Sequence, residues 1–341
     1  MAANTTSSLP TTLSVFYDKV FLERYKALLV FGTGAKQKKI PRNSGASIIF
    51  NRMAVPNLAV TPLTEATNPT EINLTSSQIT VIVKQYGNVT RTSDFYELVS
   101  IDAGLKEQTE VMAQNAAETI NQVIRATITG FQTLSATAAP TLQRAAARAT
   151  DNLIVAGDVL TGQEIRRAVR TLKKNKAMAF EDGFFKAIIP VEAAYDLRGS
   201  TEWLDAQRYV DPTLIKTGEI GKLHGVRFYE TNESTVTNAG IVTATQNYAV
   251  SGTAVTASVA INGVTVTDIY ETLIFGREAF AIVEIEGSDS GKDPIVIVKT
   301  PGASDTSNAL NMYQTIGWKA TFATVMLNPL WILSVRTAVG V

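Results

Sequence analysis

The sequence predicts an α+β protein with antiparallel sheet and few helices. Strand-type apolar runs recur through the last quarter of the chain, and only two long segments have clear helical periodicity, 102–129 and 161–175. The expected strands of this region are 273–275, 279–285, 294–298, 315–327 and 331–335.

The longest helical pattern covers 102–129. Its apolar residues recur every three or four positions and form one stripe, which indicates a helix packed on one face. Asp102 is the expected N-cap and Gly130 the expected stop. Such a helix is about 40 Å long at 1.5 Å per residue. The stripe consists of Leu105, Met112, Ala116, Ile120, Val123, Ile124 and Ile128.

The second helix follows Thr161, which has the spacing of a capping box with Glu164. Its apolar face repeats at helical spacing, and its opposite face is basic. A solvated surface is the first interpretation of the basic face, and contact with nucleic acid is the alternative. The apolar face is Ile165, Ala168, Val169 and Leu172, and the basic face is Arg166, Arg167, Arg170, Lys173 and Lys174. A strand at 184–189, a short helix at 191–198 and a strand at 225–231 are expected next.

The N-terminal quarter predicts extended parts. Residues 1–12 are typical of a flexible arm, an amphipathic helix is expected around 15–25, and a basic stretch follows in an irregular segment up to Arg42. Strands at 47–53 and 78–86 flank the long irregular stretch 54–77. Long irregular stretches are uncommon inside compact domains. We therefore expect a projecting two-stranded arm without a core of its own.

Residues 235–267 differ in composition from their surroundings. They are rich in Thr, Val, Ala and Gly and nearly free of charge, with short alternating runs. This pattern predicts a small β-rich insertion. A surface protrusion is the favoured interpretation, and a buried extra strand pair is the alternative.

Composition excludes several classes of protein. The chain has 341 residues, no cysteine, and 31 basic against 31 acidic residues. Thiolate chemistry and disulfides are therefore impossible, and balanced charge argues against affinity based on phosphate neutralisation. No apolar run reaches the roughly 18 residues of a membrane helix, and the N-terminus lacks a secretion signal pattern. We expect a soluble protein made in a reducing cytoplasm, with no membrane partner.

Motifs that carry chemistry are not found. The single histidine, His224, is expected in a turn or core, since a catalytic triad needs further partners and one histidine cannot build a multi-histidine metal site. The GSDSGKD segment at 287–293 has three spacer residues where a phosphate-binding loop has four, and Asp where that loop has Ser or Thr. We therefore predict no catalytic residue, no cofactor and no metal. A pair of carboxylates that hydrolyses a substrate has no sequence motif, so this alternative stays open.

A set of ordered segments resembles the N4-like family of tailed-phage major capsid proteins, which are similar to the HK97-type shell fold. The segments run from near residue 13 to the C-terminal region. They are YDKVFLER (17–24), IPRNSG (40–45), PLTE (62–65), VKQYG (83–87), IRRAVRTL (165–172), AYDLR (194–198), GEIGKLHGVRF (218–228) and IGWKATFA (316–323).

The resemblance implies an HK97-type division of the chain. It places an N-terminal arm at 1–44, an extended loop at 45–90, a peripheral domain at 91–155 and 313–330 with the spine helix 102–129, and an axial domain at 156–312 and 331–341. The insertion 235–267 fits the family pattern least. The subunit-interface candidates are Phe16, Tyr17, Lys36, Lys38, Lys39, Arg42, Pro56, Leu63 and Glu65.

The function implied by the resemblance is a coat protein that self-assembles into the icosahedral head around double-stranded DNA. Its expected partners are copies of itself in hexamers and pentamers, scaffold, portal and decoration proteins, and packaged DNA in weak non-specific contact. The expected location is the virion, after assembly in the host cytoplasm. The alternatives are a carboxylate-dependent hydrolase and a nucleic-acid-binding protein that uses the two basic stretches.

Overall fold

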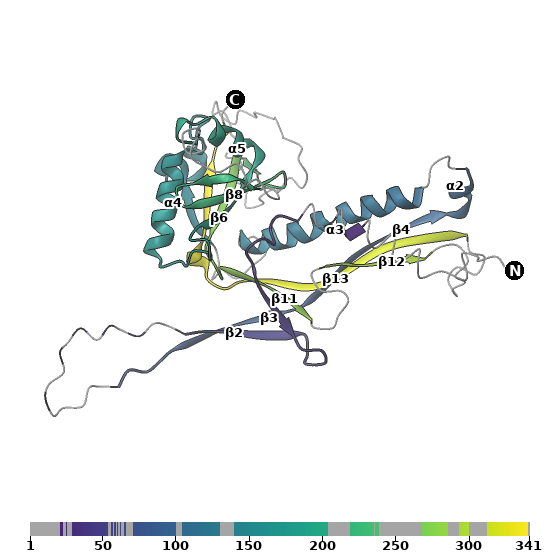
Figure 1. The fold of residues 1–341 in the computed structure, drawn as a ribbon, viewed down its shortest axis with the longest axis horizontal. Helices are drawn as coiled ribbons and strands as arrows, with labels where there is room; N and C mark the ends of the chain where they lie inside the picture. Colours follow the sequence, from purple (N-terminus) through teal and green to yellow (C-terminus); the bar gives the residue numbers. More distant parts are fainter. Residues whose placement is uncertain are drawn as a thin grey trace.

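The chain forms two sheets in different parts of an elongated molecule, and a two-stranded hairpin projects from it (Figure 1). No helix of the described part is long and apolar enough to cross a membrane. This computed structural model describes residues 21–22, 25, 29–53, 56, 58, 60, 62, 65, 71–99, 104–129, 140–203, 219–234, 236–238, 268–285, 293–299 and 312–339.

The five-stranded sheet is organised around one long strand, β13. Strands β11 and β12 pair antiparallel along one edge of β13, and β4 pairs antiparallel along the other edge. Strand β1 adds to β11 in parallel. The strands are β1 (Lys36–Ile40), β4 (Lys84–Ser93), β11 (Phe280–Ile285), β12 (Ile295–Lys299) and β13 (Tyr313–Met326).

Helix α3 (Gly104–Ile128) covers this sheet and confirms the long predicted helix. Its buried face includes the expected stripe from Met112 to Ile128, with Val123 half-buried, and also Ala113 and Ala117. The stripe packs against the β13 residues Ile316, Trp318 and Phe322. Polar contacts fix the register of this packing: Trp318 Nε1 donates to Asn115 Oδ1 at 3.2 Å, and the hydroxyls of Thr127 and Thr324 are 2.7 Å apart. Asp102, Gly130 and the side chain of Leu105 lie outside the described residues.

The N-terminal segment contributes to the same core. The described residues Phe21, Leu22 and Tyr25 are helical, and Phe21 and Tyr25 are fully buried in the core cluster. Their rings stack at 6.2 Å. The N-terminal region is therefore anchored here through aromatic burial.

The hairpin consists of β2 (Ser47–Met53) and β3 (Ser76–Ile82), antiparallel from Ser47 opposite Ile82 to Met53 opposite Ser76. The single strand expected at 78–86 is two strands, because the chain leaves the hairpin at Val83 and enters the five-stranded sheet as β4. The arm shares an apolar cluster with the body at its base, in line with the expectation that it has no core of its own. There, Ile48, Phe50, Ile79 and Val81 pack in a small cluster with residues of the five-stranded sheet, among them Ile40, Val283 and Ala323.

The seven-stranded sheet has the order β5-β14-β10-β6-β8-β7, with β9 also paired to β10. The pairs β5–β14 and β6–β8 are parallel, so the described sheets are mixed and not purely antiparallel as expected. The connection from β6 through α5 (Val191–Arg198) allows the parallel pair. The strands are β5 (Thr141–Arg144), β6 (Phe185–Pro190), β7 (Glu219–Leu223), β8 (Val226–Thr231), β9 (Val236–Asn238), β10 (Asp268–Phe275) and β14 (Ile332–Thr337). The remaining short elements are α2 (Asp94–Val99), η1 (Ala145–Ala147), η2 (Asp151–Leu153) and η4 (Pro329–Trp331).

Helix α4 (Gly162–Lys174) packs its predicted apolar face against this sheet, but the predicted capping box was wrong. Thr161 makes no side-chain capping bond. Glu164 instead accepts hydrogen bonds from Gln143 Nε2 at 2.8 Å and from the Ala146 backbone N–H at 3.1 Å. The buried carboxylate therefore joins α4 to β5 and the η1 turn, which are distant partners that local spacing cannot reveal.

Sheet membership differs from the expected domain division. Strand β5 lies in the seven-stranded sheet, although 91–155 was assigned with the long helix. Strands β11 and β12 lie in the five-stranded sheet, although 156–312 was assigned to the other domain. The chain crosses between sheets at the short turn after Phe275, where Arg277 N–H donates to Met178 O at 2.8 Å. Strands pair with the neighbours that tertiary packing places beside them and not in chain order. This explains why β5, β11 and β12 lie in other sheets than the expected division assigned.

Only β9 of the expected insertion 235–267 is described, since residue 235 and residues 239–267 lie outside the described part. Asn238 and Asp268 are direct antiparallel partners. The two ends of 239–267 are therefore neighbours in the sheet, as an insertion requires.

Replacing Ile120 by Asp should lower the free energy of unfolding by about 4 kcal/mol, because an unpaired carboxylate would enter an apolar core. Ile120 is 0% exposed, whereas Val111 on the same helix is 65% exposed. Val111→Asp is the matched control and should change stability by less than about 1 kcal/mol. Denaturant unfolding of both variants measures this, and equal effects would contradict the assignment of the buried face.

Replacing residues 239–267 by a two-residue Asn-Gly turn should leave a soluble, folded subunit, because Asn238 and Asp268 already pair in register. The melting temperature and circular dichroism of the full chain and this variant provide the measurement. An insoluble or unfolded variant would instead favour the alternative, that 239–267 supplies a buried part of the sheet.

Candidate functional site: exposed surfaces of the hairpin and the long helix

The basic stretch before Pro41 is an edge strand, so the expected irregular arm was wrong here. Strand β1 pairs in parallel with β11 and thereby satisfies its backbone groups on one side. Lys36 Nζ lies 3.0 Å from Glu278 Oε1, and Lys38 Nζ lies 4.8 Å from the centre of the Phe50 ring. Lys39 and Arg42 are exposed. Two of the four cations are therefore engaged within the chain, and two face outward.

The remaining interface candidates are placed only in part. Pro56 and Glu65 are exposed on the segment between β2 and β3. Phe16, Tyr17 and Leu63 lie outside the described residues. Their role in subunit contact stays a prediction.

The hairpin beyond its base exposes large apolar side chains. Leu58 and Val60 are each 82% exposed, and Met53 is 70% exposed. Ile72 and Leu74 follow the same pattern on the returning segment. Exposed apolar groups that gather on one element mark interaction surfaces. Figure 1 shows this hairpin extending away from both sheets, so the described chain offers these side chains no cover.

A second exposed apolar surface was not predicted from the sequence. Helix α2 exposes Phe95, Tyr96 and Val99 at the end of the five-stranded sheet. Ser93 caps this helix, since its Oγ accepts from the Tyr96 N–H at 3.3 Å. The available signal was the dense run of large residues in DFYELV directly after β4.

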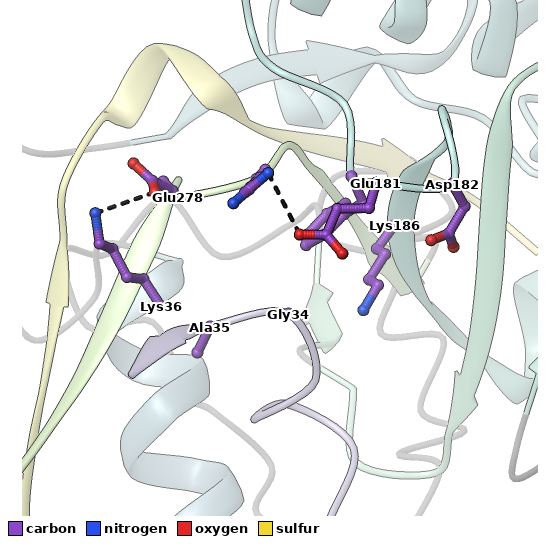
Figure 2. Close-up of a pocket in the computed structure, with 9 residues that line it drawn as sticks. Gly34, Ala35, Lys36, Glu181, Asp182, Lys186 and Glu278 are labelled. Carbon is purple, nitrogen blue, oxygen red and sulfur yellow. Dashed lines mark ion pairs between the residues drawn. The ribbon is translucent and has the colours of Figure 1, made fainter. Parts of the chain in front are cut away.

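The two sheets meet at an open depression of about 530 Å³, shown in Figure 2. Most of its charged side chains are paired with opposite charges, and Lys186 Nζ lies 4.5 Å from the centre of the Phe180 ring. Besides the Lys36–Glu278 pair, an Arg277 nitrogen lies 3.6 Å from Glu181 Oε1, and an Arg227 nitrogen lies 2.9 Å from Asp182 Oδ2. The first pair joins β1 to the turn after β10, and the other two join that turn and β8 to the segment before β6. They fit a role in holding the two sheets together.

His224 lies in the turn between β7 and β8 with a positive φ of 50°. Its Nε2 is 2.9 Å from Glu202 Oε2, and an Arg166 nitrogen is 3.2 Å from the other oxygen of that carboxylate. The hydrogen bond with His224, followed by the charge of Arg166, lowers the pKa of Glu202. The three side chains link α4 to two neighbouring segments at the surface. Among the described residues, no cluster of three or more His, Asp or Glu side chains could hold a metal ion.

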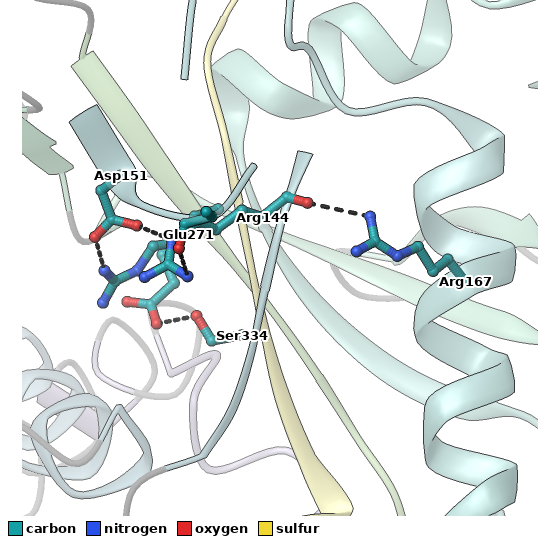
Figure 3. Close-up of polar contacts among 7 residues, drawn as sticks. Arg144, Asp151, Arg167, Glu271 and Ser334 are labelled. Atoms are coloured by element: carbon teal, nitrogen blue, oxygen red, sulfur yellow. Dashed lines mark hydrogen bonds and ion pairs between the residues drawn. The ribbon is translucent and has the colours of Figure 1, made fainter. Parts of the chain in front are cut away.

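A polar network orders one end of the seven-stranded sheet, as Figure 3 shows. Arg144 Nε lies 2.5 Å from Asp151 Oδ1, and Arg336 pairs with the other oxygen of Asp151. Ser334 donates to Glu271, and an Arg167 nitrogen donates to Arg144 O at 3.3 Å. This network holds β5 against β14 and α4, which explains why a four-residue strand is retained at the edge of the sheet.

A polar junction connects α3 to the seven-stranded sheet. Asn121 and Arg125 interrupt the apolar stripe of α3 and are buried. Asn121 Nδ2 donates to Glu233 Oε1 at 3.4 Å, and an Arg125 nitrogen donates to Ser234 O at 3.2 Å. Burial raises the pKa of Glu233 to about 7, against the opposing effects of Asn121 and Arg125. Both partners come from the segment after β8, so the long helix is tied to the other sheet at this point.

Comparisons with solved structures identify the class of fold that this arrangement defines, which is the HK97-type capsid fold. A chain from the capsid of Ralstonia phage GP4 matches with a TM-score of 0.64 and 11% identity, over 92% of each chain. A chain from the capsid of the cyanophage P-SCSP1u matches with a TM-score of 0.58 and 13% identity, over 91% of this chain and 88% of that one. A chain of the cyanophage Pam1 capsid matches with a TM-score of 0.57 and 14% identity, over 87% and 86%. No family model and no curated protein matches the sequence.

Stability should depend on Glu233 between about pH 4.5 and 7. In this window the folded protein keeps a proton that the unfolded chain has released, because the folded pKa is about 7 against an ordinary value of 4.5. The free energy of unfolding therefore falls as pH rises through the window and levels off above it. Glu233→Gln cannot ionise, so its melting temperature should decline less than that of the unmodified chain.

Melting curves from pH 4.5 to 8 measure the effect. Glu107→Gln, at an exposed position on α3, is the matched control and should follow the unmodified chain. Parallel pH profiles for all three proteins would contradict the burial of the Glu233 carboxyl at this junction.

Proposed function

We propose that this protein is the major capsid protein of a tailed phage of the N4-like type. Copies of it assemble into hexamers and pentamers of an icosahedral head that encloses double-stranded DNA. The observation that carries the proposal is the combination of an HK97-type fold over nearly the whole chain with a projecting hairpin whose large apolar side chains are exposed.

The physical argument begins with the hairpin. Beyond the cluster at its base, it contributes little to the core of its own chain, so its apolar side chains are buried only if another molecule covers them. A second copy of the chain is the partner that a homopolymeric shell supplies. Obligate interfaces between subunits bury about 2,000–5,000 Å² or more, and an extended hairpin adds area to such a contact.

In this proposal, each of the two sheets corresponds to one domain of the HK97-type division. The seven-stranded sheet with α4 and α5 corresponds to the axial domain, and the five-stranded sheet with α3 corresponds to the peripheral domain. The hairpin β2–β3 corresponds to the extended loop. Scaffold, portal and decoration proteins are further proposed partners, with assembly in the host cytoplasm and the virion as the final location.

Shell formation should require the segment between β2 and β3. Joining Met53 to Ser76 through an Asn-Gly turn in place of residues 54–75 keeps the register, because these two residues are direct partners. The variant should be soluble with an unchanged melting temperature and should form no shells, because the apolar contact surface is removed. Negative-stain microscopy and light scattering of the purified protein provide the measurement.

Point substitutions distinguish the effect of the apolar side chains from the effect of shortening the segment. Replacing Leu58, Val60, Ile72 and Leu74 by Ser should reduce the yield of shells strongly, whereas Asn73→Ser with Thr75→Ser, exposed neighbours in the same segment, should not. Normal shells from the shortened variant would contradict the assembly role of the hairpin. An unmodified chain that stays a small, monodisperse particle under all assembly conditions would argue for an enzyme instead.

A further inference from the structure

The exposed side of helix α4 carries a group of cations near its C-terminal end. We define the α4 basic face as Arg170, Lys173, Lys174 and Lys176, all of which are exposed. The opposite side of the helix, including Ile165, Ala168 and Leu172, is fully buried against the seven-stranded sheet. Figure 1 shows α4 on the outer side of this part of the molecule, so the face is presented on a rigid support.

These four cations differ from their neighbours in having no carboxylate partner within the described residues. Arg166 pairs with Glu202 at 3.2 Å, and Arg167 pairs with Glu164 at 3.2 Å. No ion pair among the described parts of the chain includes a member of the α4 basic face, and the sequence has no acidic residue between Glu164 and Glu181. Among the described residues, the positive charge of this face is therefore not neutralised and can meet an external anion.

The backbone at Lys176 gives a second, independent observation. The helix ends in a Schellman turn, with Lys176 N–H donating to Lys173 O at 3.0 Å and Ala177 N–H donating to Leu172 O at 3.0 Å. Lys176 occupies the left-handed position of this turn, with a φ of 54°. Glycine or asparagine is the residue that this position favours, and a side chain with a β-carbon costs about 1 kcal/mol there. A lysine at this place is therefore not explained by the turn itself.

The helix dipole explains only part of the pattern. Cations in the last turn of a helix gain about 0.3–1 kcal/mol from the dipole, which covers Lys173 and Lys174. It does not account for Lys176, which lies beyond the helix, nor for Arg170 a full turn earlier. Asn175 fixes the turn, since its Nδ2 donates to Leu330 O and its carbonyl accepts from Trp331 Nε1, at 3.1 and 3.2 Å.

The chemistry of the face selects the kind of partner. Protein partners are usually bound through several apolar or aromatic anchors, whereas α4 exposes no large apolar side chain and only Met178 is exposed in the segment that follows it up to residue 190. The positions 170 and 174 lie about 6 Å apart along the helix axis, at 1.5 Å per residue, so their long side chains can reach separate phosphates, which are spaced by about 3.4 Å along the axis for each strand. Lysines act as flexible point charges, which suit contact with phosphates without sequence preference.

We propose that the α4 basic face binds the phosphate backbone of duplex DNA, without sequence preference and with low affinity. The proposal rests on the proposed function in one respect only: the DNA is the genome that the shell encloses. Four phosphate contacts correspond to a decrease of about 3.6 in log K per unit of log salt concentration. Such a contact is compatible with a net charge of zero, because it depends on a local surface and not on the charge of the whole chain.

The test measures binding of the full-length, unassembled subunit to a fluorescent 30-base-pair duplex by anisotropy, over a range of salt concentrations. The variant is Arg170→Gln, Lys173→Gln, Lys174→Gln and Lys176→Asn, since asparagine tolerates the left-handed position. It should bind more than about tenfold more weakly at low salt, and its salt dependence should be smaller by about 3.6, because four phosphate contacts are lost.

The matched control removes the same charge from another part of the chain. Arg52, Lys84, Arg91 and Lys299 are exposed and lie outside both basic stretches, and their replacement by Gln gives an equal change of net charge. The control should bind DNA as the unmodified chain does. Equal losses in the two variants would show a non-local charge effect and overturn the proposal, as would an α4 variant with unchanged affinity and salt dependence.

Two further measurements keep the result decisive. Arg170→Gln alone leaves the terminal turn intact and should lower the salt dependence by about 0.9, so a folding defect of the fourfold variant does not hide the outcome. Polyglutamate serves as a competing probe, and α4-dependent binding of polyglutamate in preference to DNA would overturn DNA as the partner. Shell formation is scored separately on the same proteins, so failure of the DNA contact and failure of the proposed function are distinguishable.

Discussion

The packing of α3 against β13 is the contact on which the rest of the structure depends. A helix of 25 residues gains most of its stability from such packing and little from intrinsic propensity. Strand β13 in turn is the only described strand of its sheet that pairs with β4, β11 and β12. The same helix carries Asn121 and Arg125 to the segment after β8, so the position of the second sheet also depends on it.

The two sheets are joined by short connections and by a shared apolar cluster, in which Ile188, Leu273 and Phe275 of the seven-stranded sheet pack with residues of α3 and β13. Strand β13 leads through Pro329–Trp331 into β14, while β10 leads through the turn at Gly276 into β11. The Lys36–Glu278 and Arg277–Glu181 pairs lie at the same crossing. In a molecule built this way the core lies between the two sheets, while the hairpin and α2 are exposed and available to other subunits. This separation of core from contact surface fits the proposed shell role.

Local patterns predicted the elements whose partners are close in sequence. The stripe of α3, the apolar face of α4 and the helix at 191–198 were predicted within one or two residues, because helical periodicity records which side is buried. The strand at 47–53 was also predicted with its bounds. The errors have one physical cause. Glu164 has the spacing of a capping residue, but it accepts hydrogen bonds from Gln143 and Ala146, and the Lys36–Ile40 segment becomes a strand only because β11 lies beside it.

The sequence by itself determined the fold class, the long helix, the projecting segment and the candidate cations on α4. These properties follow from periodicity, from turn-forming residues and from the order of charges along the chain. Only the tertiary structure decided which strands share a sheet, that Asn121 and Arg125 are buried against Glu233 and Ser234, and that α2 exposes its aromatic residues. It also decided which cations have partners: Arg166 and Arg167 meet carboxylates, whereas Arg170 and Lys173 do not within the described residues. The reason is that pairing and burial depend on residues far apart in the chain, and their distances are set by the packing of the whole molecule.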